Sequence, residues 1–290
     1  MRVSAIQLSY TDEDSQPARI ERAVQLVRAQ RGSDLVVLPE LWSPGGFSYR
    51  DWGRRAETVE SGPTVQALSA VAREIGAYVH LGSILEADAE ALERIAAHDY
   101  DVTAMPELPD GSRGLWNTSV VVSPAGEVVA RYRKIHRFGF GSGEPKLIEA
   151  GQDIVTVPLD VDGRTVTLGL ATCYDLRFPE LFRALLDAGA EVVAVPAAWP
   201  APRVDHWSLF SRARAAEDFF ALVACNTAGY HAGTEMGGQS VIVDASGSVL
   251  AEAASDETVI VADIDIDAIH ERRRSFPALH DRRLNLSESR

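Results

Sequence analysis

The sequence predicts an α/β protein in which two mixed sheets pack together with helices on the outside. Short apolar runs alternate with amphipathic, alanine-rich stretches from one end of the chain to the other, a pattern typical of α/β folds. At least ten candidate strands are present, which is crowded for a single open sheet. Because no linker-like stretch interrupts the alternation, residues 1–290 are predicted to form one domain.

The candidate strands are runs rich in Val, Ile and Thr, which suit half-buried or fully buried positions in a sheet. Three dipeptides with turn character, Ala125-Gly126, Asp162-Gly163 and Ser246-Gly247, are predicted to join adjacent strands as hairpins. In chain order the predicted strands are Val3–Leu8, Leu35–Leu38, Ala77–Ser83, Thr118–Ser123, Val128–Tyr132, Thr165–Thr172, Val192–Pro196, Ala221–Asn226, Ser240–Val243 and Val259–Ile264.

The candidate helices have apolar positions near a period of 3.6 residues. Pro17, Pro63 and Pro179 stand close to three helix starts, where the missing N–H of proline costs little. The predicted helices are Pro17–Arg31, Thr64–Ile75, Pro179–Ala188 and His206–Phe219.

One segment, residues 86–114, breaks this alternation. It combines an acidic, alanine-rich piece (EADAEALERIAAHDYD) with a proline-containing loop (MPELPDGSRG). A long insertion of this kind sometimes forms a lid over a site, and it can equally be a surface helix and loop with no part in the chemistry. Both interpretations are open at this stage.

The composition argues against several classes of protein. A formal net charge of −14 without a basic block argues against binding to a nucleic-acid backbone. Apolar runs such as Val192–Trp199 are far shorter than the roughly 18 residues that span a membrane, and MRVSAIQLSY at the N-terminus lacks the apolar core of a signal peptide. Two cysteines cannot form a disulfide framework, so the cytoplasm is the expected compartment.

The most informative segment is TVTLGLATCYDLRFPE, residues 165–180. A strand of the buried type leads into Cys173, and a short polar turn follows before the next helix. A thiol at a strand end that faces a helix start can have a lowered pKa, although cysteine is also among the residues most often buried as small hydrophobes. The polar turn favours a reactive Cys173, whereas Cys225 lies in the apolar run FALVACN and is interpreted as structural.

Two other strands end on groups that a reactive cysteine could use. In SDLVVLPELW an apolar run delivers Glu40, and in VVARYRKIHRF a strand delivers Lys134. Each alone is a weak signal, because charged residues commonly end strands. Together with Cys173 they supply a nucleophile, a carboxylate base and a cation to hold negative charge, the set that acyl transfer from an amide requires.

The segments LPELW, YRKIHRF and ATCYDLRFPEL resemble the glutamate, lysine and cysteine signatures of the nitrilase superfamily, the carbon–nitrogen hydrolases. They stand in the family's order, and the resemblance spans essentially the whole chain. DIDIDAIHERRRSFPALHDRRL resembles the family's ending, so residues 265–290 are interpreted as a C-terminal extension. The resemblance implies a four-layer αββα sandwich that assembles as a homodimer or a higher homo-oligomer.

By this resemblance Cys173 is the nucleophile, Glu40 the general base and Lys134 the electrostatic partner. The family's second glutamate corresponds to Glu144 in GSGEPKLIEAGQD, with Glu149 as a rival that fits the spacing less well. The implied reaction forms a thioester at the cysteine, releases ammonia and then hydrolyses the thioester. Neither a metal nor an organic cofactor is expected, because the seven histidines show no metal-ligand spacing with the cysteines or carboxylates.

The implied substrate is a small amide that carries a carboxylate. CYDLRFPEL and VPAAWPAPRVDHW resemble the amidase branches, and among them the omega-amidases, which deamidate 2-oxoglutaramate and 2-oxosuccinamate. Arg177 is the candidate clamp for the far carboxylate, with a structural ion pair to an acid such as Asp175 as the alternative. Trp199 is a candidate pocket wall, with plain core packing as the alternative, and the backbone N–H of Tyr174 is expected to bind the oxyanion together with the lysine.

Two further points bear on the substrate and the site. Segment 86–114 is longer than the short turn that the family implies there, and over the pocket mouth it would change the length or polarity of the accepted substrate. His136 is interpreted as a hydrogen-bonded positioner of the lysine loop.

Several alternatives remain at this stage. A deaminated-glutathione amidase, an N-carbamoyl amino-acid amidohydrolase and a nitrilase would use the same fold on other substrates. A non-catalytic binding protein is disfavoured, because a decayed enzyme should have lost at least one of the four candidate catalytic residues. A papain-like mechanism would instead make one of the histidines essential.

Overall fold

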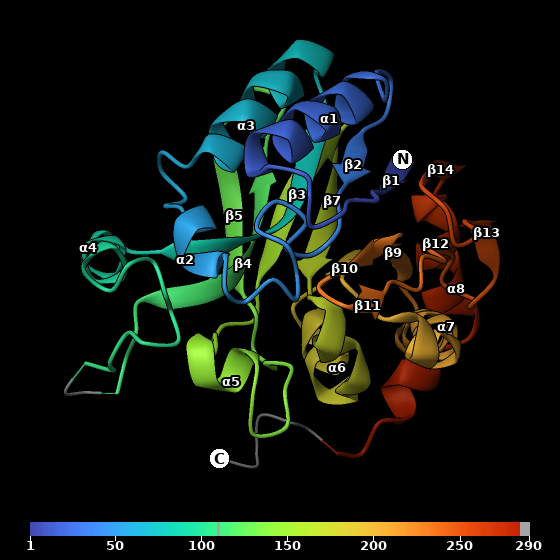
Figure 1. Ribbon diagram of the computed structural model, residues 1–290. Coiled ribbons are helices and arrows are strands. Elements are labelled where there is room, and N and C mark those ends of the chain that lie inside the picture. The colour runs from blue at the N-terminus through green and yellow to red at the C-terminus, as the bar shows by residue number, and fades with distance from the viewer. Residues whose placement is uncertain (109–110, 285–290) are drawn as a thin grey trace.

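The computed structural model describes residues 1–108 and 111–284, so positions 109–110 of the predicted insertion and 285–290 of the predicted extension lie outside the described residues. Two six-stranded mixed sheets pack against each other, with helices on both outer faces. Figure 1 shows α1 (Gln16–Arg28) and α3 (Pro63–Ile75) side by side on one side of the molecule, and α6 (Pro179–Asp187) and α7 (Val204–Asp218) on another. The expected four-layer αββα sandwich is confirmed.

The first sheet has the strand order β14-β1-β2-β3-β4-β5. Its parallel centre, formed by β1, β2 and β3, is flanked by antiparallel partners on both sides. The strands are β1 (Arg2–Gln7), β2 (Leu35–Val37), β3 (Tyr78–Ala87), β4 (Leu115–Val122), β5 (Val128–Arg133) and β14 (Thr258–Asp263).

The second sheet has the order β13-β12-β9-β8-β7-β6 and the same plan, with a parallel centre of β7, β8 and β9. A separate two-stranded ribbon, β10 (Tyr230–His231) with β11 (Thr234–Glu235), lies between β9 and β12 in the chain. The strands of the sheet are β6 (Thr156–Val161), β7 (Arg164–Leu170), β8 (Val192–Ala197), β9 (Ala221–Asn226), β12 (Val241–Val243) and β13 (Val249–Glu252).

Branched and aliphatic side chains fill the space between the two sheets. Val37 from the first sheet and Leu159, Leu168 and Val223 from the second belong to one cluster and are fully buried. Burying a side chain of this size contributes roughly 1.5–3 kcal/mol to stability. This shared core therefore fixes the two sheets relative to each other and holds their strand ends in register.

All ten predicted strands and all four predicted helices overlap observed elements, and the three predicted hairpin turns join β4 to β5, β6 to β7 and β12 to β13. Several observed elements do not correspond to any individually predicted strand or helix. β13 is an edge strand whose residues are mostly exposed, and β6 alternates buried with exposed residues around Pro158. The remaining elements are α2 (Trp52–Arg55), α4 (Ala89–Ala97), α5 (Glu144–Leu147), α8 (Ile266–Ser275) and the 3-10 helices η1 (Cys173–Arg177), η2 (Ala201–Arg203) and η3 (Ala278–Asp281).

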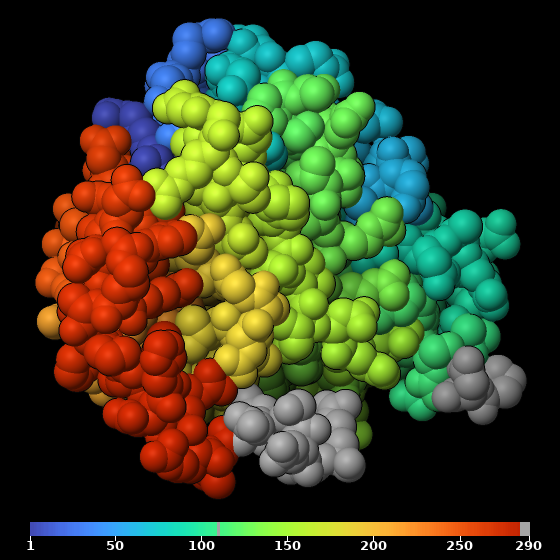
Figure 2. All heavy atoms as spheres, turned by 180° about the vertical axis from the view of Figure 1, so that it is seen from behind, coloured from blue at the N-terminus to red at the C-terminus, as the bar shows by residue number. Residues whose placement is uncertain are grey.

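The predicted insertion contributes the end of β3, then α4, and the loop that leads to β4. Ala91 and Ile95 of α4 pack against Trp52 and Leu115 in a small peripheral core. Figures 1 and 2 both show this region projecting from one side of the molecule. In Figure 2 the C-terminal segment that follows β14 lies along the opposite side. No helix among the described residues is long and apolar enough to cross a membrane.

Candidate active site

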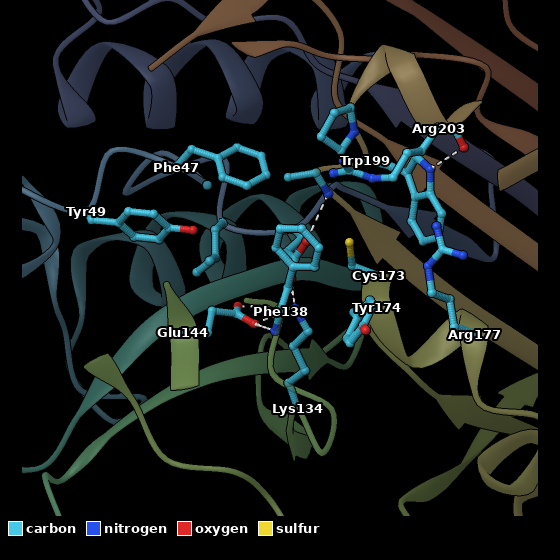
Figure 3. Close-up of a pocket in the computed structure, with 15 residues that line it drawn as sticks. Phe47, Tyr49, Lys134, Phe138, Glu144, Cys173, Tyr174, Arg177, Trp199 and Arg203 are labelled. Carbon is cyan, nitrogen blue, oxygen red and sulfur yellow. Dashed lines mark hydrogen bonds and ion pairs between the residues drawn. The ribbon is translucent and has the colours of Figure 1, made fainter. Parts of the chain in front are cut away.

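The candidate catalytic residues meet where strands of both sheets end. Glu40 follows β2, Lys134 follows β5 and Cys173 follows β7, while Glu144 begins the short helix α5. These four side chains line one pocket. Figure 3 shows Lys134 and Glu144 on one side of this pocket and Trp199 and Arg177 on the other.

Cys173 is the first residue of η1, where the chain turns sharply after β7. Its φ of 47° lies in the left-handed region, which costs a non-glycine residue on the order of 1–3 kcal/mol and must be held by its surroundings. Two hydrogen bonds provide that support: the Asp175 carboxylate accepts the backbone N–H of Thr172 at 2.8 Å, and the Asp175 N–H donates to the Thr172 carbonyl at 3.0 Å. The turn places the sulfur atom in the pocket (Figure 3).

The fully buried carboxylate of Asp175 joins the cysteine turn to the lysine loop. One of its oxygens accepts the Tyr132 hydroxyl at 2.7 Å and the Thr172 N–H at 2.8 Å. The other accepts both the backbone N–H of His136 at 3.0 Å and its Nδ1 at 2.7 Å. The His136 ring also stacks on Phe178 with centroids 3.7 Å apart. Asp175 and His136 therefore hold Lys134 and Cys173 at a fixed separation.

A buried ammonium between two buried carboxylates forms the charged centre of the pocket. Lys134 Nζ donates to Glu40 Oε1 at 2.7 Å and to both oxygens of Glu144, at 3.1 and 2.9 Å. Each of these three side chains is at most 5% exposed. In such a dry site each ion pair is stronger than on the surface, and each group depends on its partners for solvation.

Neutral N–H groups complete this centre. The Ala198 N–H, just after β8, donates to Glu40 Oε2 at 2.9 Å, and the Phe138 N–H donates to Glu144 Oε2. Asn117 on β4 donates from Nδ2 to Glu40 Oε1 and to Glu144 Oε1, both at 2.8 Å. Every carboxylate oxygen of the pair thus accepts at least one hydrogen bond.

The pKa directions follow from this arrangement. Burial raises the pKa of Glu40, but the Lys134 ammonium and the donated hydrogen bonds outweigh it, and the net shift is downward. Burial and the nearby Glu40 charge raise the pKa of Glu144 despite the lysine. The two carboxylates outweigh burial and hold the pKa of Lys134 well above its usual range. The resting site therefore holds an ammonium ion beside an ionised Glu40.

The expected lowering of the Cys173 pKa is wrong for the resting site. Burial and the adjacent Glu40 carboxylate raise the pKa of this thiol well above its usual range, and Lys134 offsets only part of that rise. The helix that begins at this cysteine is the short 3-10 helix η1, which has five residues. The thiol is therefore protonated at rest and faces a carboxylate that can accept its proton.

The opposite wall of the pocket is aromatic and cationic. Trp199 is 3% exposed and its indole N–H donates to the Arg203 carbonyl at 2.7 Å. The Arg177 guanidinium lies over the Trp199 ring, 4.9 Å from its centroid, and the Arg203 guanidinium lies 5.2 Å from the centroid of Phe138. Among the described residues neither arginine forms an ion pair, and Arg177 makes only long contacts, of 3.4 Å, with His206 Nδ1.

The structure places the other predicted residues as follows. Tyr174 and Trp199 line the pocket, and Arg177 is not paired with Asp175. Glu149, the rival of Glu144, instead accepts the backbone N–H groups of Arg113 and Gly114 outside the pocket. No described residue of segment 86–114 lines the pocket.

Sequence reasoning missed four residues that line the pocket, Arg203, Phe138, Phe47 and Tyr49, and also Asn117, which contacts two of its glutamates. Arg203 stood inside a segment that was singled out, VPAAWPAPRVDHW, and Asn117 directly precedes the predicted strand Thr118–Ser123. For Asn117, a polar residue next to an apolar strand was the available signal. The aromatic residues carried no such signal, because their side chains suit a core equally well.

Comparison with known proteins identifies the family. A protein-family model described as carbon–nitrogen hydrolase matches residues 2–274. The chain belongs to the carbon–nitrogen hydrolase family. This carbon–nitrogen hydrolase is 42% identical to the 2-oxoglutaramate amidase of Paenarthrobacter nicotinovorans, over 98% of this chain and 90% of the relative. It is 32% identical to the 2-oxoglutaramate amidase of Bacillus subtilis (strain 168), with 89% and 88% covered.

Solved structures agree with this assignment. A CN-hydrolase superfamily protein from Xanthomonas campestris superposes on this carbon–nitrogen hydrolase with a TM-score of 0.82 at 27% identity, covering 99% of this chain and 98% of the other. The family and the amidase relatives make the protein an amide-hydrolysing enzyme. Within the described residues, no group of three or more His, Cys, Asp or Glu side chains is placed to hold a metal ion.

Proposed function

We propose that this carbon–nitrogen hydrolase is an omega-amidase-like enzyme that converts a small carboxylate-bearing amide to the acid and ammonia through a thioester on Cys173. One observation carries the proposal: the thiol faces a Lys134 ammonium held between two buried carboxylates, across a pocket from two arginines, neither of which forms an ion pair among the described residues. The relatives named 2-oxoglutaramate amidase support the same substrate class.

The first half of the reaction makes the thioester. Glu40 takes the proton of the Cys173 thiol, and the sulfur attacks the carbonyl carbon of the amide. The oxyanion forms beside the Lys134 ammonium and the backbone N–H of Tyr174, an arrangement in which removal of one donor typically costs ~2.7–4 kcal/mol. Glu40 then gives its proton to the amide nitrogen, the carbon–nitrogen bond breaks and ammonia leaves.

The second half returns the enzyme to its starting state. Glu40 takes a proton from a water molecule, and the hydroxide attacks the thioester carbon. The carbon–sulfur bond breaks, the acid leaves, and Glu40 returns its proton to Cys173. The sum is amide plus water giving acid plus ammonia. Glu144 keeps the lysine charged and correctly placed through both halves.

The second wall supports the assignment of a carboxylate-bearing substrate. A guanidinium binds a carboxylate through two parallel N–H bonds. Arg177 and Arg203, neither of which forms an ion pair among the described residues, present that chemistry at the pocket of a protein whose net charge is −14. Trp199 and Phe138 keep the two guanidinium groups against the pocket wall.

The test is ammonia release from a panel of 2-oxoglutaramate, deaminated glutathione, N-carbamoyl amino acids and aliphatic nitriles. The wild type should prefer 2-oxoglutaramate, and mass spectrometry should detect an acyl adduct on Cys173. Cys173→Ala and Lys134→Met should abolish turnover. Cys225→Ala is the matched control, because Cys225 lies between the sheets with its thiol bonded to backbone carbonyls, and it should remain active.

The remaining outcomes decide among the alternatives. Ammonia from nitriles alone would overturn the amidase assignment, and preference for another panel member would replace the omega-amidase substrate. Turnover retained in Cys173→Ala would overturn the thioester mechanism. A papain-like mechanism requires an essential histidine and an active Lys134→Met variant.

We also infer a reducing compartment, the cytoplasm, and a homodimer or higher homo-oligomer. Both cysteines are free, which suits a reducing environment. Light scattering coupled to size-exclusion chromatography tests the assembly, and a monomer over the working concentration range would contradict it.

A further inference from the structure

One buried side chain of the charged centre has no role in the proposed reaction. Asn117 lies in β4, is 1% exposed and contacts both carboxylates through the same nitrogen atom. Its backbone carbonyl also accepts the N–H of Lys134 at 2.9 Å. A single residue thus contacts the base, the second glutamate and the lysine.

We propose that Asn117 is a positioning residue that aligns Glu40 and Glu144 on either side of Lys134 by donating one N–H to each carboxylate, and that it thereby sets the lower pH limit of the reaction. The proposal rests on the proposed function of this site. It concerns a group that takes no part in bond making and acts only through the glutamates.

The orientation of the Asn117 amide follows from its neighbours. If the amide were turned over, its oxygen would face two carboxylate oxygens, which offer no proton to share. In the orientation that donates to both glutamates, Oδ1 is buried and has no hydrogen-bond partner. A buried polar atom without a partner is uncommon and costly, so the two donated bonds must outweigh this loss.

Asn226 shows what a purely structural buried asparagine looks like in the same molecule. Its Nδ2 donates to the carbonyls of Trp199 and Gly238, and its Oδ1 accepts the N–H groups of Trp199 and Thr227. Both polar atoms of its side chain are therefore satisfied by backbone groups. Asn117 instead directs its whole donor capacity at two carboxylates and leaves its acceptor unpaired.

The chemistry of the site explains why a neutral double donor is needed. In the resting site all three N–H bonds that Lys134 can form are directed at the two glutamates, yet the reaction needs one of them for the oxyanion. Asn117 continues to hold both carboxylates when the lysine turns toward the oxyanion. A second cation would do the same but would neutralise the base, whereas an amide adds no charge.

The effect on pH has a definite sign. Hydrogen bonds donated to an ionised carboxylate lower its pKa, so removing Asn117 raises the pKa of Glu40. The reaction needs this group ionised, and the acidic limb of the profile of kcat/KM against pH must move to higher pH. The other titratable and charged groups that face the two carboxylates are Lys134, Cys173, Tyr49, Tyr10, Arg177 and Arg203.

Asn117→Leu is the decisive variant, because leucine is close to asparagine in shape and donates nothing. It should lower kcat/KM at pH 7 roughly 10- to 100-fold, as expected for lost hydrogen bonds to a charged group. The acidic limb should move up by about one pH unit. Asn117→Asp, which keeps the shape more closely and adds a like charge, should move the limb at least as far and serves if the leucine variant does not fold.

Ser119→Ala is the matched control. Ser119 points to the same face of β4 two residues on, is fully buried and bonds to Thr172 rather than to either glutamate. This variant should keep the acidic limb at its wild-type position. Circular dichroism and urea unfolding establish that each variant is folded before its profile is compared.

A second assay separates this proposal from the proposed function. On a Cys225→Ala background Cys173 is the one thiol, and its rate of alkylation by iodoacetamide against pH reports proton transfer to Glu40 without any substrate. If no panel amide is turned over but the acidic limb of the alkylation rate still moves to higher pH in Asn117→Leu, the proposed function fails and this inference stands. If turnover is as proposed but the asparagine variants keep both wild-type limbs, Asn117 has only a packing role.

Discussion

Much of the site could be predicted from the sequence because several of its residues stand at the ends of recognisable strands. Glu40 and Lys134 follow strands of the first sheet that run in the same direction, so they lie at a common edge of that sheet, and Cys173 follows a strand of the second sheet. The structure brings these three side chains together with Glu144. Asn117 was not predicted, because its importance depends on which residues of other strands its side chain meets.

The protonation state of Cys173 could not be predicted from its place in the sequence either. A strand end beside a helix start favours a thiolate, but in the folded protein burial and the neighbouring Glu40 carboxylate dominate. In the proposed mechanism the thiol therefore keeps its proton until Glu40 accepts it. The direction of this pKa shift requires the geometry of the folded site.

At the residue scale, the two pocket arginines should determine selectivity for a carboxylate. Arg177→Ala and Arg203→Ala should each raise KM for 2-oxoglutaramate roughly 10- to 100-fold, the usual size for a lost charge-assisted bond, with a smaller change in kcat. Steady-state kinetics with 2-oxoglutaramate and with its methyl ester, in which the carboxyl group is uncharged, measures this selectivity. An equal loss on both substrates would mean that the arginines only support the pocket wall.

At the scale of elements, long and regular segments were predictable and short edge segments were not. α3 carries an apolar stripe and a proline at its start, and β9 is buried throughout. By contrast β13 is mostly exposed, and α2 and α5 have only four residues each. Such elements owe their shape to tertiary packing, which local sequence patterns do not contain.

A buried acid that precedes α3 and contacts its first turn makes stability depend on pH. Glu57 accepts the N–H of Thr64 in the first turn, and burial raises its pKa from 4.5 to about 7. Below pH 4.5 the folded and unfolded chains both hold the proton. As pH rises toward 7, the unfolded chain releases the proton and the folded chain keeps it, so stability falls.

Glu57→Gln should therefore remove this pH dependence while keeping an acceptor for Thr64. The free energy of unfolding of the wild type should fall between pH 4 and pH 8 by up to about 3 kcal/mol more than that of the variant. Urea unfolding at the two pH values measures the difference. Parallel pH dependence in both proteins would show that Glu57 ionises normally in the folded state.

At the scale of the whole molecule, the number of strands was enough to predict two sheets, but their order was not predictable. β14 follows two strands of the second sheet in the chain and yet pairs with β1 of the first. Hairpin turns specify pairing between neighbours in sequence. Pairing between strands far apart in the sequence depends on the global fold, so the pairing of β1 with β14 could not be predicted from local patterns.

The core between the sheets should control stability without taking part in the chemistry. Leu159 of β6 is fully buried there and does not line the pocket. Leu159→Ala should lower the free energy of unfolding by about 2–5 kcal/mol. The kcat of the folded enzyme should stay near the wild-type value. Urea unfolding and kinetics on the same preparation test both parts, and a large loss of kcat would show that the core also shapes the site.

The pairing of β1 with β14 has a consequence for biosynthesis. Residues 2–7 are synthesised long before their antiparallel partner, residues 258–263. The nascent chain therefore carries an open strand edge in its first sheet until residues 258–263 emerge. Open edges invite pairing with other chains, so we expect the unfinished first sheet to be more prone to wrong pairing than the complete one.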